Sequence, residues 1–211
     1  MPTGEIIVVS APSGTGKTTL IRRLLAEVEG IRFSVSHTTR NPRPGETDGA
    51  DYHFVDRARF DAMVAKGEFL EWAEVYAPRY GTAVSEVEGP LSRGEDVLLD
   101  VDTQGARSVR ARRPESVLIF ILPPGVQALA ARIASRGQDG PEQMARRVET
   151  AGYEVAALDM YDYCVVNDTV ERALGDLKAI VRACRLRRHR APETVLKIVR
   201  EFGKAGPSPA P

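Results

Sequence analysis

Apolar and polar positions along the chain form two kinds of pattern. Continuous short apolar runs predict buried parallel strands at Ile6–Ser10, Asp96–Asp100, Val117–Leu122 and Tyr163–Val166. Between them, apolar positions recur at helical spacing, in one stripe from Val126 to Ile133 and in another over residues 170–184. The second helix is predicted to begin with a capping box at Asp168 and Glu171. Strands that alternate with helices predict an α/β fold with a doubly wound, mostly parallel sheet.

Two segments interrupt this alternation. Residues 40–49 are dense in turn-forming residues, and short β-like pieces surround a helix at about Arg57–Lys66, so residues 36–90 are predicted to form an inserted subdomain. Residues 126–158 are helical and rich in arginine, and we expect them to form a lid over the carboxyl edge of the sheet, where open α/β folds bind ligands. The core of a domain over residues 4–185 then comprises residues 4–35, 91–125 and 159–185.

Residues 186–211 form a C-terminal extension of a different character. Residues 193–202 predict an amphipathic helix that packs on the domain or on another subunit, which leaves a homo-oligomer open. Residues 203–211 are rich in glycine, proline and alanine and predict a disordered end. The arginines and the histidine of residues 182–190 are interpreted as cations that complement a helix C-terminus rather than as an RNA-binding arm.

Composition narrows the possible partners. The 211 residues carry 29 basic and 29 acidic side chains, and a formal net charge of zero argues against a general nucleic-acid or anionic-membrane binder. Cys164 and Cys184 are too few for a disulfide framework, and each is expected to behave as a small apolar residue. Apolar runs fall short of a membrane span and residues 1–5 lack the basic start of a signal peptide, so we expect a cytoplasmic protein.

The first predicted strand leads into a phosphate-binding loop. The sequence APSGTGKTTL matches the pattern G-x-x-x-x-G-K-[ST] except that Ala11 replaces the first glycine. Glycines let the backbone N–H groups curl around phosphate oxygens, and the helix that follows points its positive N-terminus at the same anion. Lys17 would supply a charge to the β- and γ-phosphates, and the Thr18 hydroxyl would bind Mg²⁺. The predicted ATP-binding residues of the loop are Ala11, Pro12, Ser13, Gly14, Thr15, Gly16, Lys17, Thr18 and Thr19.

A second acidic motif ends the strand at residues 96–100. Asp100 and Asp102 are two residues apart, so at strand spacing they point to the same face near the loop. Asp100 is a candidate second ligand of Mg²⁺, but which acid organises the metal and which contacts substrate stays open at this stage. A phosphate loop alone fits ATPases, GTPases and kinases.

Longer motifs distinguish among these classes. Residues 33–46 (FSVSHTTRNPRPGE), Gly49-x-Asp51-Tyr52-x-Phe54, residues 68–72 (EFLEW), residues 80–82 (YGT) and residues 100–105 (DVDTQG) together closely resemble guanylate kinases. The resemblance continues through Arg132-x-x-x-Arg136-Gly137, Arg147 and residues 166–168 (VND), and covers about residues 4–185. Ala11, Thr18 and Thr82 depart from the usual family residues without loss of function, because alanine is small and threonine keeps the hydroxyl.

The resemblance implies a P-loop NTPase-type fold and the reaction ATP + GMP → ADP + GDP, with Mg²⁺ and with dGMP as a second acceptor. It implies that the GMP phosphate is clamped by Arg40, Arg43, Tyr52 and Tyr80. It implies that guanine and its surroundings are contacted by Glu71, Ser36, Thr82, Asp100 and Asp102. Around the transferred phosphoryl group it places the catalytic residues Lys17, Arg132, Arg136 and Arg147, and near adenine it places Asn167.

Two alternatives were weighed against this interpretation. A non-catalytic scaffold of the same family, which binds peptides on the GMP surface, typically loses parts of the phosphate loop, whereas Gly14, Gly16, Lys17 and Thr18 are intact here. A kinase for another nucleotide is disfavoured because Ser36 and Glu71 suit guanine. Because a kinase must exclude water from its reacting phosphate, residues 36–90 and 126–158 are expected to close over bound GMP and ATP.

Overall fold

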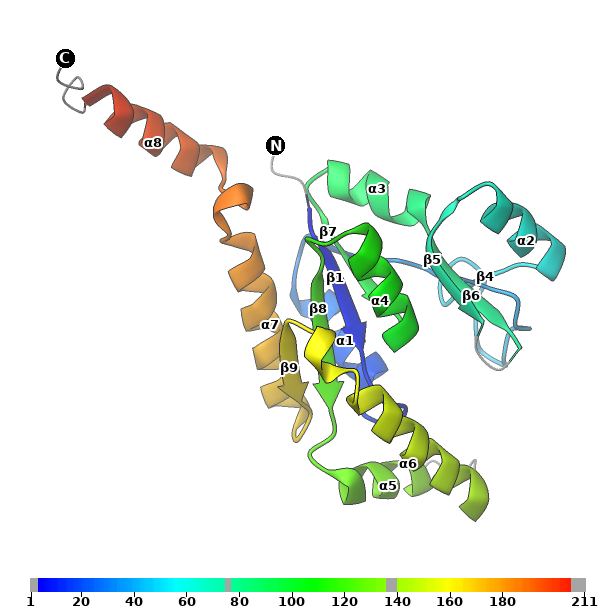
Figure 1. The fold of residues 1–211 in the computed structure, drawn as a ribbon. Coiled ribbons are helices and arrows are strands. Elements are labelled where there is room, and N and C mark those ends of the chain that lie inside the picture. The colour runs from blue at the N-terminus through cyan, green and yellow to red at the C-terminus, as the bar shows by residue number, and fades with distance from the viewer. Residues whose placement is uncertain (1–3, 75–76, 136–139, 206–211) are drawn as a thin grey trace.

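A computed structural model describes residues 4–74, 77–135 and 140–205 (Figure 1). Within these residues, five strands form a wholly parallel central sheet in the order β2-β7-β1-β8-β9. The strands are β1 (Ile6–Ser10), β2 (Ile31–Phe33), β7 (Asp96–Asp100), β8 (Val117–Leu122) and β9 (Tyr163–Val166). The predicted α/β fold is therefore confirmed, and the four predicted strands have the bounds expected from their apolar runs.

The two edges of the sheet differ from expectation. Strand β2 was not predicted, because it is three residues long and its central Arg32 is exposed. Strand β9 was predicted as buried, but it is an edge strand in which Val165 is the one buried residue. Cys164 is consequently exposed, whereas Cys184 is buried, and both are free thiols.

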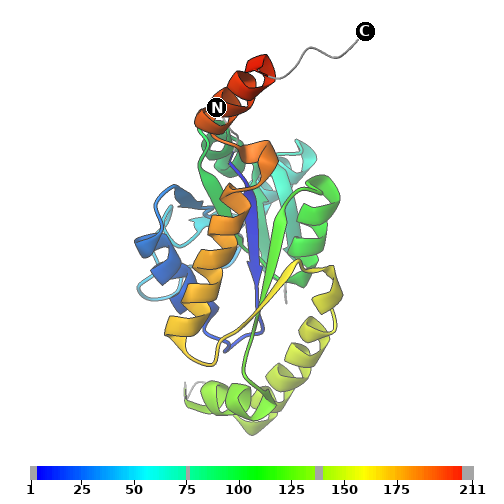
Figure 2. The same ribbon diagram turned by 90° about the vertical axis from the view of Figure 1, so that its left-hand side faces the viewer.

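Helices cover both faces of the central sheet (Figures 1 and 2). Ile7 and Val9 of β1 point to the face covered by α1 (Lys17–Glu27) and α7 (Val170–Arg185). Ile6 and Val8 point to the face covered by α3 (Val84–Ser92) and α4 (Thr103–Arg112). Because both faces are buried, the central strands have continuous apolar runs rather than alternating ones.

The start of α7 lies one residue later than predicted. Its N-cap is Thr169, whose hydroxyl accepts a hydrogen bond from the Arg172 backbone N–H at 3.4 Å. Asp168 instead accepts from the Thr169 backbone N–H at 2.7 Å, so the expected capping box does not form.

The inserted segment forms a second, smaller sheet to one side of the core (Figure 1). Its strands run in the order β4-β3-β6-β5, and α2 packs on them with its own apolar cluster of Phe60, Met63, Phe69 and Ala83. The elements are β3 (His37–Thr38), β4 (His53–Phe54), α2 (Arg57–Ala65), β5 (Phe69–Glu74) and β6 (Arg79–Ala83). The helix expected at about Arg57–Lys66 is thus confirmed.

The segment predicted to form a lid, residues 126–158, lies at the carboxyl ends of the central strands (Figures 1 and 2). Helices α5 (Val126–Ser135) and α6 (Pro141–Val155) share a small apolar cluster built around Leu129, Ile133 and Ala151. Val126, predicted at the start of the buried stripe, is 67% exposed because it occupies the first position of α5. A short 3-10 turn, η1 (Leu158–Met160), leads back to β9.

The C-terminal extension consists of η2 (Arg188–Arg190) and α8 (Glu193–Ala205). All residues from Glu193 to Gly203 are exposed, so packing of this helix on its own domain is wrong. Residues 203–205 are helical and not a disordered end, and the remaining predicted tail, residues 206–211, lies outside the described residues. Helices in the described part of the chain are too short or too polar to cross a membrane.

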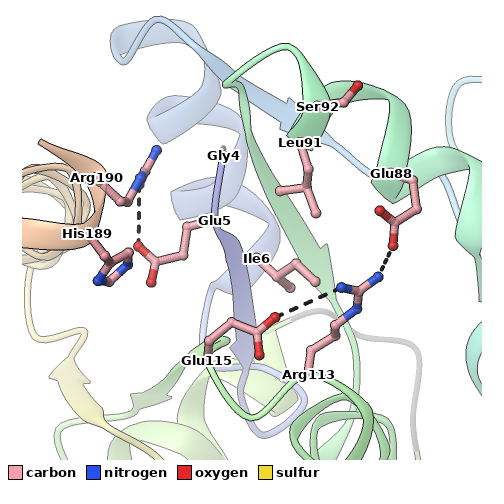
Figure 3. A pocket seen from close by; sticks show the side chains of 10 residues that line it. All are labelled: Gly4, Glu5, Ile6, Glu88, Leu91, Ser92, Arg113, Glu115, His189 and Arg190. Carbon is pink, nitrogen blue, oxygen red and sulfur yellow. Dashed lines mark hydrogen bonds and ion pairs between the residues drawn. The ribbon is translucent and has the colours of Figure 1, made fainter. Parts of the chain in front are cut away.

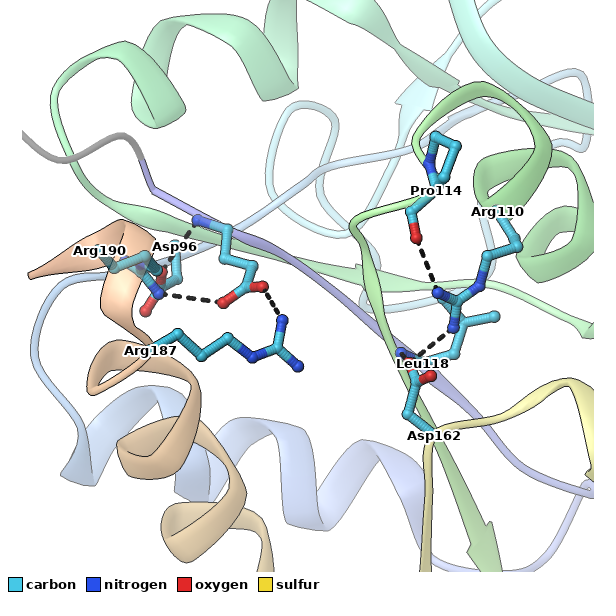
Figure 4. Close-up of polar contacts among 8 residues, drawn as sticks. Asp96, Arg110, Pro114, Leu118, Asp162, Arg187 and Arg190 are labelled. Carbon is cyan, nitrogen blue, oxygen red and sulfur yellow. Dashed lines mark hydrogen bonds and ion pairs between the residues drawn. The ribbon is translucent and has the colours of Figure 1, made fainter.

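The basic cluster before α8 forms buried ion pairs, which the interpretation as helix-end cations missed. Arg187 lies 2.5 Å from Glu5, and Arg190 lies 2.7 Å from Asp96 (Figure 4). Arg185 lies 2.8 Å from the same Asp96. Asp96 is 1% exposed and Glu5 5% exposed. Asp96 begins β7 and Glu5 immediately precedes β1, so Arg187 and Arg190 attach the extension to the amino ends of the central strands.

Candidate functional site

The phosphate loop connects β1 to α1 and leaves the N-terminus of α1 open. Gly14 and Gly16 have φ angles of 92° and 97°, which only glycine adopts without strain. A Cβ at residue 16 would lie 2.6 Å from Asn167 Nδ2, and one at residue 14 would lie 3.0 Å from Ile133 Cγ1. Gly16 is the N-cap of α1 and provides no side-chain cap, so the first backbone N–H groups of α1 remain available to an anion.

The loop is braced by the end of β9 and by the lid. The Thr15 carbonyl accepts hydrogen bonds from Asn167 Nδ2 at 2.7 Å and from Arg132 Nη1 at 3.1 Å. Arg132 also donates to the Asn167 carbonyl at 2.9 Å. Together with Gly14, Gly16 and Thr19, these residues line a cavity of about 310 Å³ beside the loop. Among the described residues, no hydrogen-bond partner is found for Asn167 Oδ1, which is buried.

Lys17 and Asp100 form an ion pair in the structure. Asp100 ends β7, which is hydrogen-bonded to β1 with Asp100 beside Val9, so the acid reaches the loop directly. Asp102 follows the strand and caps α4, where its carboxylate accepts from the Gly105 backbone N–H at 2.8 Å. The two predicted acids therefore face one cavity from different elements. Thr18 is exposed at the beginning of α1.

A cavity of about 200 Å³ brings together most of the residues expected to bind GMP. Its lining includes Lys17, Ser36, Tyr52, Glu71, Tyr80, Asp100 and Asp102. The small sheet lies to one side of the central sheet (Figure 1), with Glu71 on β5 and Tyr80 on β6, whereas Asp100 ends β7 and Lys17 begins α1. The arrangement places the Lys17 ammonium in the same cavity as three acidic side chains.

Glu71 is the buried acid of this cavity. It is 5% exposed, and its Oε1 accepts hydrogen bonds from the Thr82 backbone N–H at 3.0 Å and from the Thr82 hydroxyl at 2.6 Å. Burial raises the pKa of Glu71 above its ordinary value, while the bonds from Thr82 partly oppose that increase. A register shift between Phe69 and Glu71 in the β5–β6 pairing sets this orientation. A carboxylate held in this way is a strong acceptor for a ligand with two adjacent N–H donors.

Arg40 is held by an acid that the sequence analysis did not identify. Its guanidinium donates to both oxygens of Glu46, at 2.8 Å and 2.9 Å, and lies 5.4 Å from the centre of the Tyr52 ring. These bonds raise the pKa of Arg40 and lower that of Glu46. Tyr52 in turn packs edge-on against Tyr80, with ring centres 5.9 Å apart. In the sequence, this ion pair could have been inferred from the six-residue separation of Arg40 and Glu46 around a proline-rich turn.

Arg43 does not line the cavity of Tyr52 and Tyr80 but faces α6. Its side chain lines a second cavity, of about 720 Å³, together with Arg146, Arg147 and Glu142 of α6. Arg43 and Arg147, predicted for GMP phosphate and for the lid respectively, are therefore brought together. Of the other two arginines predicted for the lid, Arg132 bonds to the phosphate loop and Arg136 lies outside the described residues.

Two further charged residues lie near the site, and no sequence motif pointed to either of them. Glu154 on α6 is partly buried, which raises its pKa, and it is close enough to Lys17 for the cation to oppose that shift. Arg112 on α4 donates to the Phe69 carbonyl at 2.6 Å, and its charge acts to lower the pKa of Glu71.

Comparison with known proteins gives a consistent result. The guanylate kinase family model matches residues 3–184. Guanylate kinases from Alkalilimnicola ehrlichii and Symbiobacterium thermophilum are 50% and 47% identical to the chain, over 94% and 96% of it and over 98% and 96% of their own lengths. The guanylate kinase from Rhodopseudomonas palustris is 53% identical over 89% of the chain and 86% of its own length. A crystal structure of guanylate kinase from Anaplasma phagocytophilum superposes with a TM-score of 0.75 at 35% identity, covering 90% of each chain.

Proposed function

The chain belongs to the guanylate kinase family and transfers the γ-phosphoryl group of ATP to GMP, and on this basis we propose how its own residues carry out the reaction. The observation that carries the proposal is the cavity that joins Lys17 of the phosphate loop to the buried acid Glu71. One wall of that cavity suits a phosphate and the other suits a base with two donors.

Guanine is recognised at Glu71. The free lone pairs of its carboxylate accept from guanine N1–H and the 2-amino group, while Thr82 fixes the carboxylate from behind. Ser36 and Asp102 line the same cavity and contact the remaining polar edge of the base and its surroundings. Adenine offers no such donor pair, so its binding would leave a buried acid without partners. These contacts do not involve the ribose 2′-hydroxyl, so dGMP is proposed as a second acceptor.

The GMP phosphate is bound at the edge of the small sheet. Tyr52 and Tyr80 face the cavity, and Arg40 lies beside Tyr52 with its fork held by Glu46. Arg43 approaches the same phosphate from the side of the lid. Glu46 orients Arg40 and also competes with the phosphate for it, which sets the affinity of this subsite.

ATP is bound by the phosphate loop, residues 11–19. The backbone N–H groups at the start of α1 and the Lys17 ammonium bind its β- and γ-phosphates, and Lys17 exchanges Asp100 for the nucleotide. The adenine lies at the cavity beside Asn167, whose buried Oδ1 accepts from the 6-amino group. Thr18 and Asp100 offer the hard oxygen donors that Mg²⁺ prefers, and the metal would supply charge neutralisation between the phosphates.

Phosphoryl transfer depends on positioning and charge neutralisation. A GMP phosphate oxygen forms the new bond to the γ-phosphorus as the bond from that phosphorus to ADP breaks, and the nucleophile is already an anion. Lys17, Arg132 and Arg147, with Arg136, neutralise the charge that spreads over the transferred group. We place this activity in the cytoplasm and in purine nucleotide metabolism, because it consumes ATP and GMP.

An ADP-release assay tests the proposal. With GMP, dGMP, AMP, CMP and UMP as acceptors, turnover is expected with GMP and dGMP, and a preference for AMP would contradict the role of Glu71. Lys17→Ala should abolish most of the turnover with GMP while the circular dichroism spectrum stays that of the wild type. Lys66→Ala provides a matched control, because Lys66 is an exposed lysine at the end of α2. Wild-type turnover in Lys17→Ala would mean that the loop is wrongly assigned.

A further inference from the structure

A pair of histidines lies behind the wall of the cavity of about 200 Å³ in which GMP is proposed to bind, called here the GMP cavity. His37 of β3 and His53 of β4 are register partners in the small sheet, and their ring centres are 4.5 Å apart. Each histidine immediately follows a residue that lines the GMP cavity, Ser36 in one case and Tyr52 in the other. Because successive side chains along an extended chain point to opposite faces, the two rings lie on the face turned away from the cavity.

The strand pairing that carries these rings is short. Strands β3 and β4 comprise two residues each, and β4 is the edge strand of the small sheet. The His53 backbone N–H donates to the Ser36 carbonyl at 2.9 Å, and the Val55 backbone N–H donates to the Thr38 carbonyl at 3.0 Å. Because so few bonds join two parallel strands, the position of Tyr52 relative to Ser36 also depends on the contact between the two rings.

His37 has surroundings that suit a neutral ring. Phe69 packs edge-on against it with ring centres 5.7 Å apart, and His37 Nδ1 is buried with no hydrogen-bond partner among the described residues. Burial, and then the charge of His53, lower the pKa of His37. Protonation places a hydrogen on both ring nitrogens, so the Nδ1–H of a cationic His37 would have no acceptor. Neutral His37 is therefore the form that fits this packing.

Four charged or titratable groups act on His37 from the elements around it. Glu86 of α3 and Asp48, in the loop before β4, favour its protonated form. Arg59 of α2 and His53 oppose that form. Glu86 also lies 3.6 Å from His53 Nε2, so the pair is located where the small sheet meets a helix of the core. The acids and bases around the pair therefore set the pH at which His37 becomes charged.

We propose that His37 and His53 are positioning residues for GMP, and that GMP binds tightly only while the His37 ring is neutral. The inference rests on the proposed binding of GMP between Ser36, Tyr52 and Glu71. A cationic His37 must be solvated and is repelled by any charge on the second ring, and both effects separate the rings. Separation moves β4 away from β3 and carries Tyr52 away from Ser36, so the cavity no longer matches GMP. The histidines act through these cavity residues and not by contact with the nucleotide.

The direction of the effect distinguishes positioning from simple charge attraction. The GMP phosphate is an anion, and its field alone would favour a cationic His37 and raise the pKa of His37 on binding. Positioning has the opposite consequence, because a ligand that selects the neutral ring lowers the pKa of that ring by linkage. The phosphate loop lies between β1 and α1 and not in the small sheet, so the affinity for ATP should not depend on His37.

Calorimetric titration with GMP between pH 5 and pH 8 tests the pair. The ratio of the GMP dissociation constants of the wild type and His37→Gln removes the titration of Glu71 and of the GMP phosphate, which both proteins share. This ratio should rise by about twofold or more from pH 7 to pH 5, because only the wild type gains a charge at residue 37. The corresponding ratio for ATP should stay constant, which controls for partial unfolding at low pH. A constant ratio for GMP overturns the proposal.

The third histidine provides a matched control. His189 is exposed and lies beside Glu5 and Arg190 at the edge of a cavity of about 410 Å³, away from the small sheet (Figure 3). His189→Gln removes a histidine without touching β3 or β4, so its GMP affinity should follow that of the wild type at every pH. A His189→Gln profile that matches His37→Gln instead would overturn the assignment to the pair.

Two charge substitutions shift the effect and leave both rings in place, so they test the proposal even where His37→Gln does not fold. Glu86→Gln removes an acid that favours the cationic ring, and the midpoint of the GMP affinity profile should move to lower pH. Arg59→Gln removes a cation that opposes it, and the midpoint should move to higher pH. Shifts in the same direction, or no shift in either variant, overturn the proposal.

Nuclear magnetic resonance measures the charge of His37 directly. The sequence contains three histidines, so each ring signal can be assigned from the loss of one signal in the corresponding His→Gln variant. On saturation with GMP, the titration midpoint of His37 should move to lower pH. An unchanged midpoint, or one that moves to higher pH, overturns the positioning role even where GMP is phosphorylated normally. Absence of GMP phosphorylation would instead contradict the proposed function.

Discussion

Replacing Glu71 by glutamine tests the proposed base contact, because the amide keeps the shape of the side chain and changes its charge and donors. Glutamine can still accept the two hydrogen bonds from Thr82 through its carbonyl oxygen. Its amino group, however, presents donors where guanine N1–H and the 2-amino group need an acceptor. The variant therefore isolates the base contact from the local packing.

The expected loss follows from the two hydrogen bonds removed. Hydrogen bonds to a charged acceptor contribute about 1.5–3 kcal/mol each, so losing two costs about 3–6 kcal/mol of GMP binding. This corresponds to an affinity for GMP that is lower by about 10²- to 10⁴-fold. Thermal or urea unfolding without added nucleotide should show no matching loss of stability, because burial of the ionised Glu71 carboxylate is itself unfavourable.

The pH dependence of stability and of GMP affinity provides a second measurement of the role of Glu71. Because the pKa of Glu71 is raised in the folded chain, its contribution to stability is present at low pH and is lost as the pH rises through that value. GMP needs the ionised acid, so the affinity for GMP should fall as the pH falls through the same value. Glu71→Gln should lack this component, whereas the titration of the GMP phosphate affects both proteins equally.

Calorimetric titration with GMP between pH 5 and pH 8 measures both effects. Glu74→Gln is the matched control, because Glu74 is an exposed acid on the same strand. A Glu71→Gln affinity within threefold of the wild type, or an identical pH profile in the two proteins, would refute the assignment of Glu71 to guanine.

Three further substitutions test other parts of the structure. Gly16→Ala should weaken ATP binding in a calorimetric titration, because a non-glycine residue at its φ of 97° costs about 1–3 kcal/mol. Gly152→Ala on α6, whose Cβ would meet nothing within 4 Å, is the control and should bind ATP normally. Asp96→Ala should lower the free energy of unfolding in urea by about 3–5 kcal/mol, because it strips buried Arg190 of a partner, and a loss below about 1 kcal/mol would contradict the buried ion cluster. Burial lowers the pKa of His37, so the unfolded chain binds more protons and stability should decrease as the pH falls below 6.5; an unchanged pH dependence in His37→Gln would contradict this.

The hydrophobic pattern predicted the central strands, which helices cover on both faces, and it failed at the two edge strands of the sheet. Strands β1 and β8 are apolar throughout because helices cover both faces of the sheet. The same apolar character in β9 was taken as burial, but its position at the edge of the sheet depends on strand order, which periodicity does not encode. Strand β2 is too short for any periodicity to register.

Motifs identified most residues that line the site but not the partners that those residues take. The phosphate-loop pattern pointed to Lys17, and the resemblance to guanylate kinases pointed to Glu71 and Arg40. The pairing of Lys17 with Asp100 and of Arg40 with Glu46 depends on which acid lies nearest in space. The ion cluster at Asp96 was equally hidden, because its arginines follow it by about ninety residues of chain.

The separate apolar clusters of the small sheet and the lid have a consequence for how the molecule opens and exchanges. Phe60 and Phe69 belong to one cluster and Leu129 and Ile133 to another, and neither shares a residue with the clusters on the two faces of the central sheet. Local opening of α2, or of α5 and α6, therefore leaves the interior of the central sheet covered, whereas Leu70 of β5 belongs to the cluster under α3 and α4 and keeps that strand attached. Backbone amides of α2, α5 and α6 should exchange with deuterium faster than those of β1 and β8. The peripheral helices would then open locally while the central sheet stays folded.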